Sequence, residues 1–146
     1  MARWWSPACS LDEVRQECLP AQPAADAAHP FLAWVDDQAI GYIQSYLVAM
    51  GTSTWWPDEV GPGVVGLDGL IGSAAHIGRG WGAALVSQFR DRLLLDERIH
   101  EIRVDPHPQN AAARGCYRKV GFEEVVPIIT PDGPAVLMIY RRQRPA

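Results

Sequence analysis

The alternation of apolar and polar positions predicts a chain built largely from short strands. Apolar residues cluster over 31–35 and again over 40–48, and the polar segment 36–38 between them is typical of a hairpin turn. Another apolar run, over 64–71, predicts a third strand. Because the first two segments are joined by so short a turn, we expect them to pair as antiparallel strands.

The second half of the chain repeats this pattern. Ile102 and Val104 are separated by one polar residue and predict a fourth strand. Apolar runs over 123–130 and 135–140 flank the turn-forming residues 131–133. This arrangement predicts a second antiparallel hairpin at the end of the chain.

Helical spacing occurs in three segments. A capping pattern that starts at Ser10 predicts a short helix towards Leu19. A second helix is expected from Trp81, because large apolar side chains follow it at intervals of four residues. These side chains are Leu85, Phe89 and Leu93. A third helix is expected after Asn110, ending at Gly121.

The order of these elements predicts a mixed α/β fold. Helices alternate with strands in the middle of the chain, so they are expected to cross between parallel strands, with an antiparallel hairpin at each end. The chain has 146 residues, 48% of them apolar, which is enough to bury one hydrophobic core. We therefore expect a single domain over residues 1–146.

Charge and composition narrow the class of partner. The net charge of -4 and the pI near 5.5 argue against nucleic acid and against anionic membranes, which attract clustered Lys and Arg. A cationic small molecule fits better. The sequence has no run of about 18 apolar residues and no signal-peptide pattern at its start, so we expect a cytoplasmic protein without a membrane span.

Cysteine and histidine positions do not predict a metal site. The three cysteines form no CxxC pair, and the four histidines show no ligand spacing with one another or with the cysteines. We expect reduced thiols and no bound metal.

A glycine-rich segment offers the first candidate chemistry. Gly78, Gly80 and Gly82 alternate at the start of the helix expected from Trp81, so bare backbone N–H groups could converge on an anion such as a diphosphate. Arg79 adds a charged donor, although a solvated loop arginine explains it equally well. The spacing falls one residue short of a dinucleotide-binding GxGxxG motif, and the Lys-Ser/Thr of a Walker loop is absent.

Two motifs in this order resemble the GNAT acetyltransferases. The first is the family's (Gln/Arg)xxGx(Gly/Ala) signature, matched at Gly80 and Gly82, with Ile77 in place of the usual Gln or Arg. The second is Asn110 followed by the segment CYRKVGF at 116–122. The resemblance implies a GNAT fold, a central sheet with two parallel strands that splay apart between flanking helices, and acetyl-CoA as co-substrate.

The same resemblance implies which residues bind acetyl-CoA. Its diphosphate would lie on the loop 78–83, and its thioester oxygen would meet backbone N–H groups at the splayed strand. The implied set is Leu70, Ile71, Gly78, Arg79, Gly80, Trp81, Gly82, Ala83, Asn110 and Tyr117.

A narrower similarity, from about Trp4 to Tyr140, is to the aminoglycoside 6′-N-acetyltransferases, which acetylate an amine of the drug and give antibiotic resistance. It rests on segments that the wider class does not require: IGYIQSY at 40–46, the pair Trp55-Trp56, GLD at 66–68, VDP at 104–106 and TPDGPAV at 130–136. It implies a drug site lined by Asp68, Asp105 and Asp132 with Trp5 and Trp56. Independently of any name, a polyammonium sugar needs spaced carboxylates and flat aromatic faces.

Each acidic candidate has a plainer explanation. Asp68 lies inside an apolar strand, where burial is costly without a cationic partner, although it could face solvent. Asp105 could cap the following helix or form a turn, and Asp132 is a residue expected in a Pro-Asp-Gly turn in any case. Asp58 and Glu59 would form an acidic, aromatic flap with Trp55, or they could be ordinary loop charges.

The expected chemistry is direct transfer without an acyl-enzyme. Asp68 would bind the incoming ammonium and accept its proton, directly or through water, and Tyr117 would return a proton to the thiolate, unless it is only a core aromatic. Cys116 lacks an evident histidine partner, so a nucleophilic role is not expected. Trp34 and Trp81 are expected to be core or helix-packing residues.

Relatives in the resembled family have a further strand and helix before the position of Trp4, and these elements are not found in this sequence. The uncovered surface makes a homodimer a reasonable expectation. Two other functions remain open at this point. One is acetylation of a protein or another small amine, and the other is binding of CoA or drug without catalysis.

Overall fold

A computed structural model describes residues 29–47, 56, 61–72 and 74–143 of the chain. These residues form one mixed sheet of six strands in the order β1-β2-β3-β4-β6-β5, with two α-helices and a short 3-10 helix. The strands are β1 (His29–Val35), β2 (Gln38–Leu47), β3 (Val64–Ile71), β4 (Glu101–Val104), β5 (Glu123–Thr130) and β6 (Gly133–Arg141). The helices are η1 (Ala74–His76), α2 (Trp81–Leu93) and α3 (Ala111–Lys119). The helix expected over 10–19 lies outside the described residues.

Both predicted hairpins form, and each turn is shorter than the sequence indicates. β2 already begins at Gln38, which pairs with Val35. At the other hairpin Thr130 pairs with Gly133, so the glycine belongs to β6 and the turn contains two residues. Two-residue turns favour left-handed backbone, and Asp36 adopts it with φ of 50°.

The position of β6 was not predicted from the sequence. β6 lies between β4 and β5 and is antiparallel to both. Its segment 135–139 is buried without interruption, as expected for a central strand that is covered on both faces. The predicted parallel pairing through a crossing helix is confirmed for β3 and β4, which α2 connects.

β3 and β4 diverge after a short common stretch. They pair through three residues each, Val64–Gly66 with Glu101–Arg103. β3 then continues to Ile71, still paired with β2 on its other side. Among the described strands, the backbone of residues 67–71 therefore has a neighbour on the β2 side only, and an opening separates it from β4.

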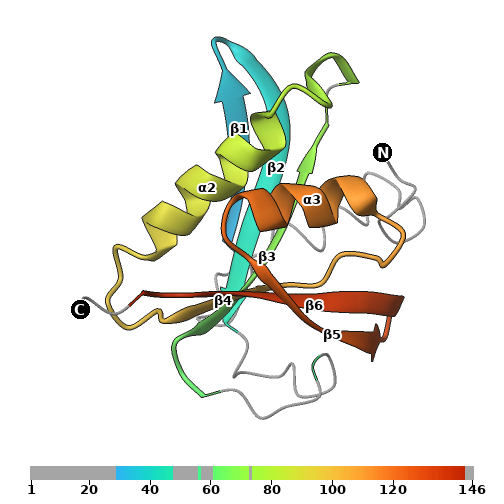
Figure 1. The fold of residues 1–146 in the computed structure, drawn as a ribbon. Coiled ribbons are helices and arrows are strands. Elements are labelled where there is room, and N and C mark those ends of the chain that lie inside the picture. The colour runs from blue at the N-terminus through green and yellow to red at the C-terminus, as the bar shows by residue number, and fades with distance from the viewer. Residues whose placement is uncertain (1–28, 48–55, 57–60, 73, 144–146) are drawn as a thin grey trace.

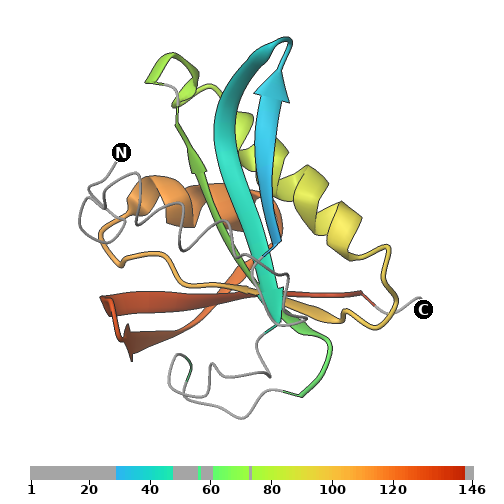
Figure 2. The same cartoon turned by 180° about the vertical axis from the view of Figure 1, so that it is seen from behind.

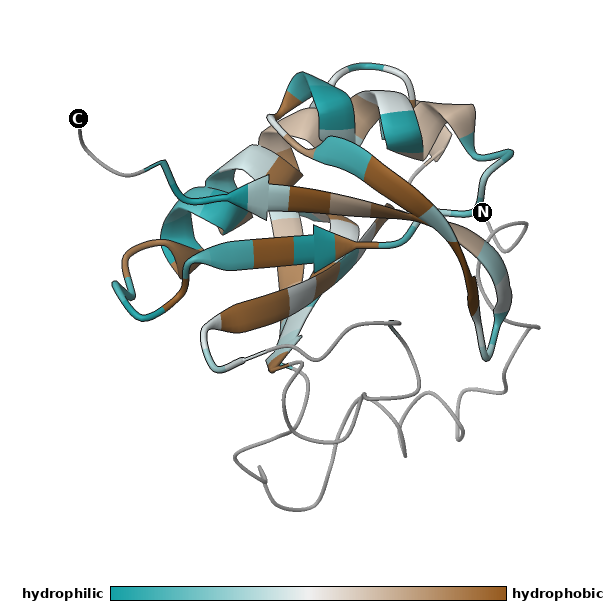
Figure 3. Ribbon diagram, turned by 60° about the horizontal axis from the view of Figure 1, so that its bottom comes forward, coloured by the Kyte–Doolittle hydropathy of each residue, from teal (hydrophilic) through white to brown (hydrophobic). Residues whose placement is uncertain are grey.

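The sheet has two different faces. α2 and α3 lie on the same face, as the two opposite views show (Figures 1 and 2). Alternation along each strand sends Ile43, Leu67, Ile102 and Met138 into the core beneath these helices. The other face carries a second cluster around Trp56, with Val64, Leu137 and Ile139 among its members. Figure 3 shows the result as brown, hydrophobic segments along the strands.

The expectation that Trp34 is a core residue was wrong. Its side chain is 59% exposed on β1, the edge strand of the sheet. Trp81 is half-buried at the first position of α2, where its ring contacts that of His76 at 6.2 Å between centroids. An aromatic residue on an edge strand has neighbours on one side only, which explains why β-strand periodicity alone did not reveal the exposure of Trp34.

Candidate active site

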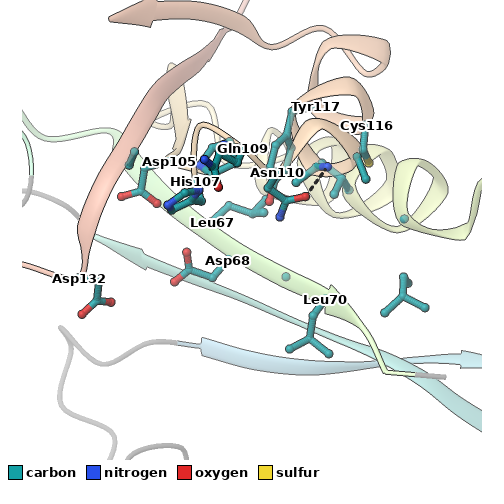
Figure 4. Close-up of a pocket in the computed structure, with 18 of the residues that line it drawn as sticks. Leu67, Asp68, Leu70, Asp105, His107, Gln109, Asn110, Cys116, Tyr117 and Asp132 are labelled. Carbon is teal, nitrogen blue, oxygen red and sulfur yellow. Dashed lines mark hydrogen bonds between the residues drawn. The ribbon is translucent and has the colours of Figure 1, made fainter. Parts of the chain in front are cut away.

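A cavity of about 1040 Å³ occupies the opening between β3 and β4. Its walls come from β3, from the loop after β4, from α3 and from the turn between β5 and β6 (Figure 4). Eight of the residues that the sequence assigned to a site line it: Asp68, Leu70, Ile71, Gly82, Asp105, Asn110, Tyr117 and Asp132.

The other assigned residues do not line this cavity or were not described. Gly78, Arg79 and Gly80 are exposed beyond its edge, and Trp81 and Ala83 are half-buried in the first turn of α2. Trp56 is buried behind the cavity wall. Trp5, Trp55, Asp58 and Glu59, and with them the expected acidic flap, lie outside the described residues.

Three carboxylates approach the cavity from different elements. Alternation along β3 places Asp68 on the face opposite the helices, because Leu67 points into the core beneath them. Asp105 directly follows β4, and Asp132 comes from the β5–β6 turn. Figure 4 shows the three side chains on one side of the cavity, with Asn110, Cys116 and Tyr117 on the other.

The ionisation of Asp68 is shifted towards neutral pH. Burial, together with the smaller effect of the negative charges of Asp105 and Asp132, raises the pKa of this carboxyl to about 6, against a hydrogen bond from Gln44 that lowers it. A carboxyl with this pKa changes its charge close to physiological pH. Such a group can take up a proton from a bound ammonium and release it again.

Asp105 is held by a buried tryptophan. Trp56 is 3% exposed, and its Nε1 donates a hydrogen bond to Asp105 Oδ2 at 3.2 Å. Tyr46 stacks against one part of this indole, with 6.4 Å between ring centroids, and the Arg103 guanidinium lies over the ring at 5.3 Å. Trp56 therefore holds the Asp105 carboxylate in place through a hydrogen bond from a buried side chain.

Replacing Trp56 with Phe should lower the free energy of unfolding by about 2 kcal/mol, because the carboxylate of Asp105 loses a hydrogen bond from a buried donor. Phenylalanine keeps an aromatic ring at this position, although the ring is smaller than the indole. The matched variant Trp34→Phe changes an exposed indole and should alter stability by less than about 0.5 kcal/mol. Urea denaturation of both variants measures the difference. Equal losses would contradict the supporting role of Trp56.

The glycine loop leaves the start of α2 without a hydrogen bond from a capping side chain. Gly80 is the N-cap residue with φ of 84°, and no side chain bonds to the first turn. Gly78 also has positive φ, 74°, and a Cβ atom at either glycine would meet nothing within 4 Å. The first N–H groups of a helix have no partners inside it and attract anions. An open, uncapped helix start next to the cavity fits a diphosphate.

The start of α3 differs, since a side chain caps it. Asn110 Oδ1 accepts a hydrogen bond from the backbone N–H of Ala113 at 3.1 Å. The asparagine that the sequence assigned to the acetyl-CoA site therefore also fixes the first turn of the helix that carries Tyr117. Figure 4 shows this bond at the cavity wall.

Tyr117 reaches the cavity as a neutral phenol. Burial raises its pKa well above the usual value, and the charge of Asp68 raises it further. The ring packs on Phe122 with 5.5 Å between centroids. Burial also raises the pKa of the adjacent Cys116 thiol. A thiol that keeps its proton is a poor nucleophile, which agrees with the expectation that Cys116 forms no acyl intermediate.

Gln44 and His107 are among the cavity residues that the sequence did not assign to the site. Gln44 lines the cavity and bonds to Asp68. His107, in the loop after β4, also lines it. The sequence did indicate that Gln44 shares a strand face with Tyr42 and Tyr46. It points to the site only once the pairing of β2 with β3 places Gln44 opposite Asp68. Among the described residues, no three His, Cys, Asp or Glu side chains gather as a possible metal site.

Comparison with known proteins decides the family. The sequence model of the acetyltransferase (GNAT) domain matches residues 1–129. The chain belongs to the GNAT acetyltransferases. This GNAT domain has the predicted fold, with the parallel strands splayed at the cavity and the glycine loop at the start of α2.

The GNAT domain is similar to named relatives over nearly its whole length. The aminoglycoside N(6′)-acetyltransferase type 1 of Klebsiella pneumoniae is 37% identical over 98% of this chain and 73% of its own. The crystal structure of the aminoglycoside acetyltransferase AAC(6′)-Ib with coenzyme A superposes with a TM-score of 0.88 at 39% identity, covering 97% of this chain and 82% of the other. The structure of AAC(6′)-Ib with coenzyme A and kanamycin gives 0.86 at 39% identity, covering 97% and 81%.

None of the helices in the described part of the GNAT domain is long and apolar enough to cross a membrane.

Proposed function

We propose that this GNAT domain transfers the acetyl group of acetyl-CoA to the 6′-amine of aminoglycoside antibiotics and thereby gives resistance to them. The observation that carries the proposal is the meeting of three carboxylates in one cavity, opposite Tyr117 and beside an uncapped helix start. Relatives with the same fold at close to 40% identity are aminoglycoside acetyltransferases. We place the reaction in the cytoplasm, where acetyl-CoA is available.

The residues present fit acetyl-CoA. The open backbone at 78–83 and the first turn of α2 would hold its diphosphate, with Arg79 adding a positive charge from the exposed loop. Residues 67–71 of β3 lack a strand partner on the side of the opening, so their free N–H groups can meet a thioester oxygen. Acetyl-CoA supplies an activated acyl carbon.

The drug would enter from the face of the sheet opposite α2 and α3. Asp68, Asp105 and Asp132 offer three negative charges to a molecule that carries several ammonium groups. Placing these carboxylates together is costly, because the charges of Asp105 and Asp132 raise the pKa of the buried Asp68 carboxyl. A polycation removes that cost, which is the physical reason for specificity towards aminoglycosides.

Proton transfer follows from the positions of Asp68 and Tyr117. A protonated amine carries three N–H hydrogens, and the amide product keeps one. Asp68 takes the first proton, which frees the nitrogen lone pair to form the C–N bond. The second proton leaves the nitrogen for solvent. As the C–S bond breaks, the Tyr117 phenol donates a proton to sulfur and recovers one from solvent. Asp68 then passes the proton it took to solvent, so one proton is released overall.

A panel of aminoglycosides tests the function. Thiol release from acetyl-CoA should occur with drugs that have a free 6′-amine and should be absent with matched drugs that have a 6′-hydroxyl. Mass spectrometry of the product should locate one added acetyl group on the 6′-nitrogen. Drug binding without any acetylated product, or acetylation of a peptide amine in preference to the drugs, would overturn the proposal.

Gly80→Asp tests the diphosphate site. Aspartate tolerates left-handed backbone better than most residues, and the control Gly80→Asn carries the same backbone strain at φ of 84°. The new carboxylate would repel the diphosphate and raise KM for acetyl-CoA about tenfold or more. Gly80→Asn has nearly the same shape without the charge and should change KM much less. Steady-state kinetics with varied acetyl-CoA distinguish the two, and equal KM values would exclude this site.

A further inference from the structure

Gln44 lies directly opposite Asp68 in the pairing of β2 with β3. Both side chains lie on the sheet face away from the helices, because their neighbours Ile43 and Leu67 are buried beneath the helices. The Gln44 Nε2 atom donates a hydrogen bond to Asp68 Oδ2 at 3.1 Å. One oxygen of the carboxylate is thereby held from the neighbouring strand.

The direction of the Gln44 amide is also determined. An amide could present either its oxygen or its nitrogen to a carboxylate, and only the nitrogen attracts it. Tyr42 lies two residues earlier on the same face of β2, and its hydroxyl donates to Gln44 Oε1 at 2.5 Å. With the amide oxygen engaged by Tyr42, the amide nitrogen is directed at Asp68.

We propose that Gln44 is a positioning residue for acetyl transfer: it holds Oδ2 of Asp68 so that Oδ1 faces the substrate ammonium, and Tyr42 fixes the direction of its amide. This inference rests on the proposed function for the role of Asp68, but the geometry of the three side chains is independent of the substrate. The sequence places Tyr42 and Gln44 on one strand face, but only the pairing of β2 with β3 brings Asp68 to them.

The arrangement has a consequence for the charge of Asp68. Donation from an amide favours the ionised carboxylate, whereas burial and the neighbouring acids favour the protonated form. The titratable groups around Asp68 come from four elements: Tyr46 of β2, Asp105 and His107 after β4, Tyr117 of α3 and Asp132 of the β5–β6 turn. Gln44 opposes the two acids among them, so it keeps Asp68 available as a base at lower pH.

Substitution of Gln44 by Leu tests this directly. The variant fills a similar space without a donor, and the pKa of Asp68 should rise by about one unit, the value expected for the loss of one hydrogen bond to a charged group. Carbon-13 NMR titration of the aspartate carboxyls measures the pKa without turnover. The ascending limb of kcat/KM against pH should move upward by the same amount, with little change on the plateau above it. Gln38→Leu, on an exposed position of the same strand, is the matched control and should leave both unchanged.

Tyr42→Phe provides a second variant that removes one oxygen atom. Because the freed amide can rotate, the pKa of Asp68 should rise in the same direction by a smaller amount. In the Gln44→Leu background the same substitution should have almost no effect, since the tyrosine acts through the amide. Circular dichroism melting of each variant shows that the fold is retained.

Two results would overturn the inference. One is an unchanged pKa of Asp68 in Gln44→Leu. The other is an equal effect of Tyr42→Phe with and without Gln44, which would indicate an action independent of the amide. If the wild-type domain acetylates no aminoglycoside, the proposed function fails, while the NMR titration still decides whether Gln44 controls Asp68.

Discussion

Asp68→Asn should lower kcat/KM for a 6′-amino aminoglycoside about a thousandfold, the loss typical of removing a positioned general base. The amide keeps the shape of the side chain but cannot accept a proton from the ammonium. It also removes the negative charge that attracts that ammonium. Because the substitution leaves the backbone of β3 and the glycine loop 78–83 unchanged, KM for acetyl-CoA should change little. Varying each substrate in turn separates the two effects.

The pH dependence adds a signature of this role. The pKa of Asp68 is raised to about 6, mainly by burial. Below pH 6 the carboxyl is protonated and cannot act as a base, so kcat/KM of the wild type should fall about tenfold for each further unit of acidity. Above pH 6 the value of kcat/KM should level off. In Asp68→Asn the fall of kcat/KM below pH 6 should disappear, whereas Asp37→Asn, in the exposed β1–β2 turn, should retain it. Full activity of Asp68→Asn would exclude Asp68 as the base.

Tyr117→Phe should lower kcat about a hundredfold with little change in either KM. The substitution removes only the hydroxyl, so the departing sulfur loses a proton donor while the ring keeps its packing on Phe122. Stability should therefore be close to that of the wild type. Steady-state kinetics and thermal melting together test this expectation.

Tyr140→Phe is the matched control for Tyr117→Phe. Tyr140 also packs on Phe122, at 5.7 Å between ring centroids, but it does not line the cavity. Removing its hydroxyl should leave kcat unchanged. If both variants turned over like the wild type, Tyr117 would be a packing residue and sulfur would receive its proton from solvent.

The fold was largely predictable because each element has a local signal. β3 has the predicted bounds, and α2 begins at Trp81 with Phe89 buried, as the four-residue spacing indicated. The position of β6 between β4 and β5 was not predictable in this way. Adjacent hairpin strands always pair with each other, but which of them joins the rest of the sheet depends on long-range packing.

The site was predictable in part, and for a different reason. The resemblance to a known family named Asp68, Asp105 and Tyr117, and the structure brings them to one cavity. Residue patterns could not tell which indole of the Trp55-Trp56 pair faces inward, so the bond from Trp56 to Asp105 was not foreseen. Gln44 was missed because its partner, Asp68, is set by the register in which β2 pairs with β3. The register between segments far apart in the chain cannot be read from either segment alone.

The divergence of β3 from β4 has a consequence for inhibitor design. Since the two substrates would meet through a gap in the sheet rather than side by side in one groove, neither has to leave before the other can bind. A compound that joins a CoA fragment covalently to an aminoglycoside would have to thread this gap, so its linker should be short, slim and free of side branches. Bulky linkers should forfeit the affinity gained by tethering the two halves.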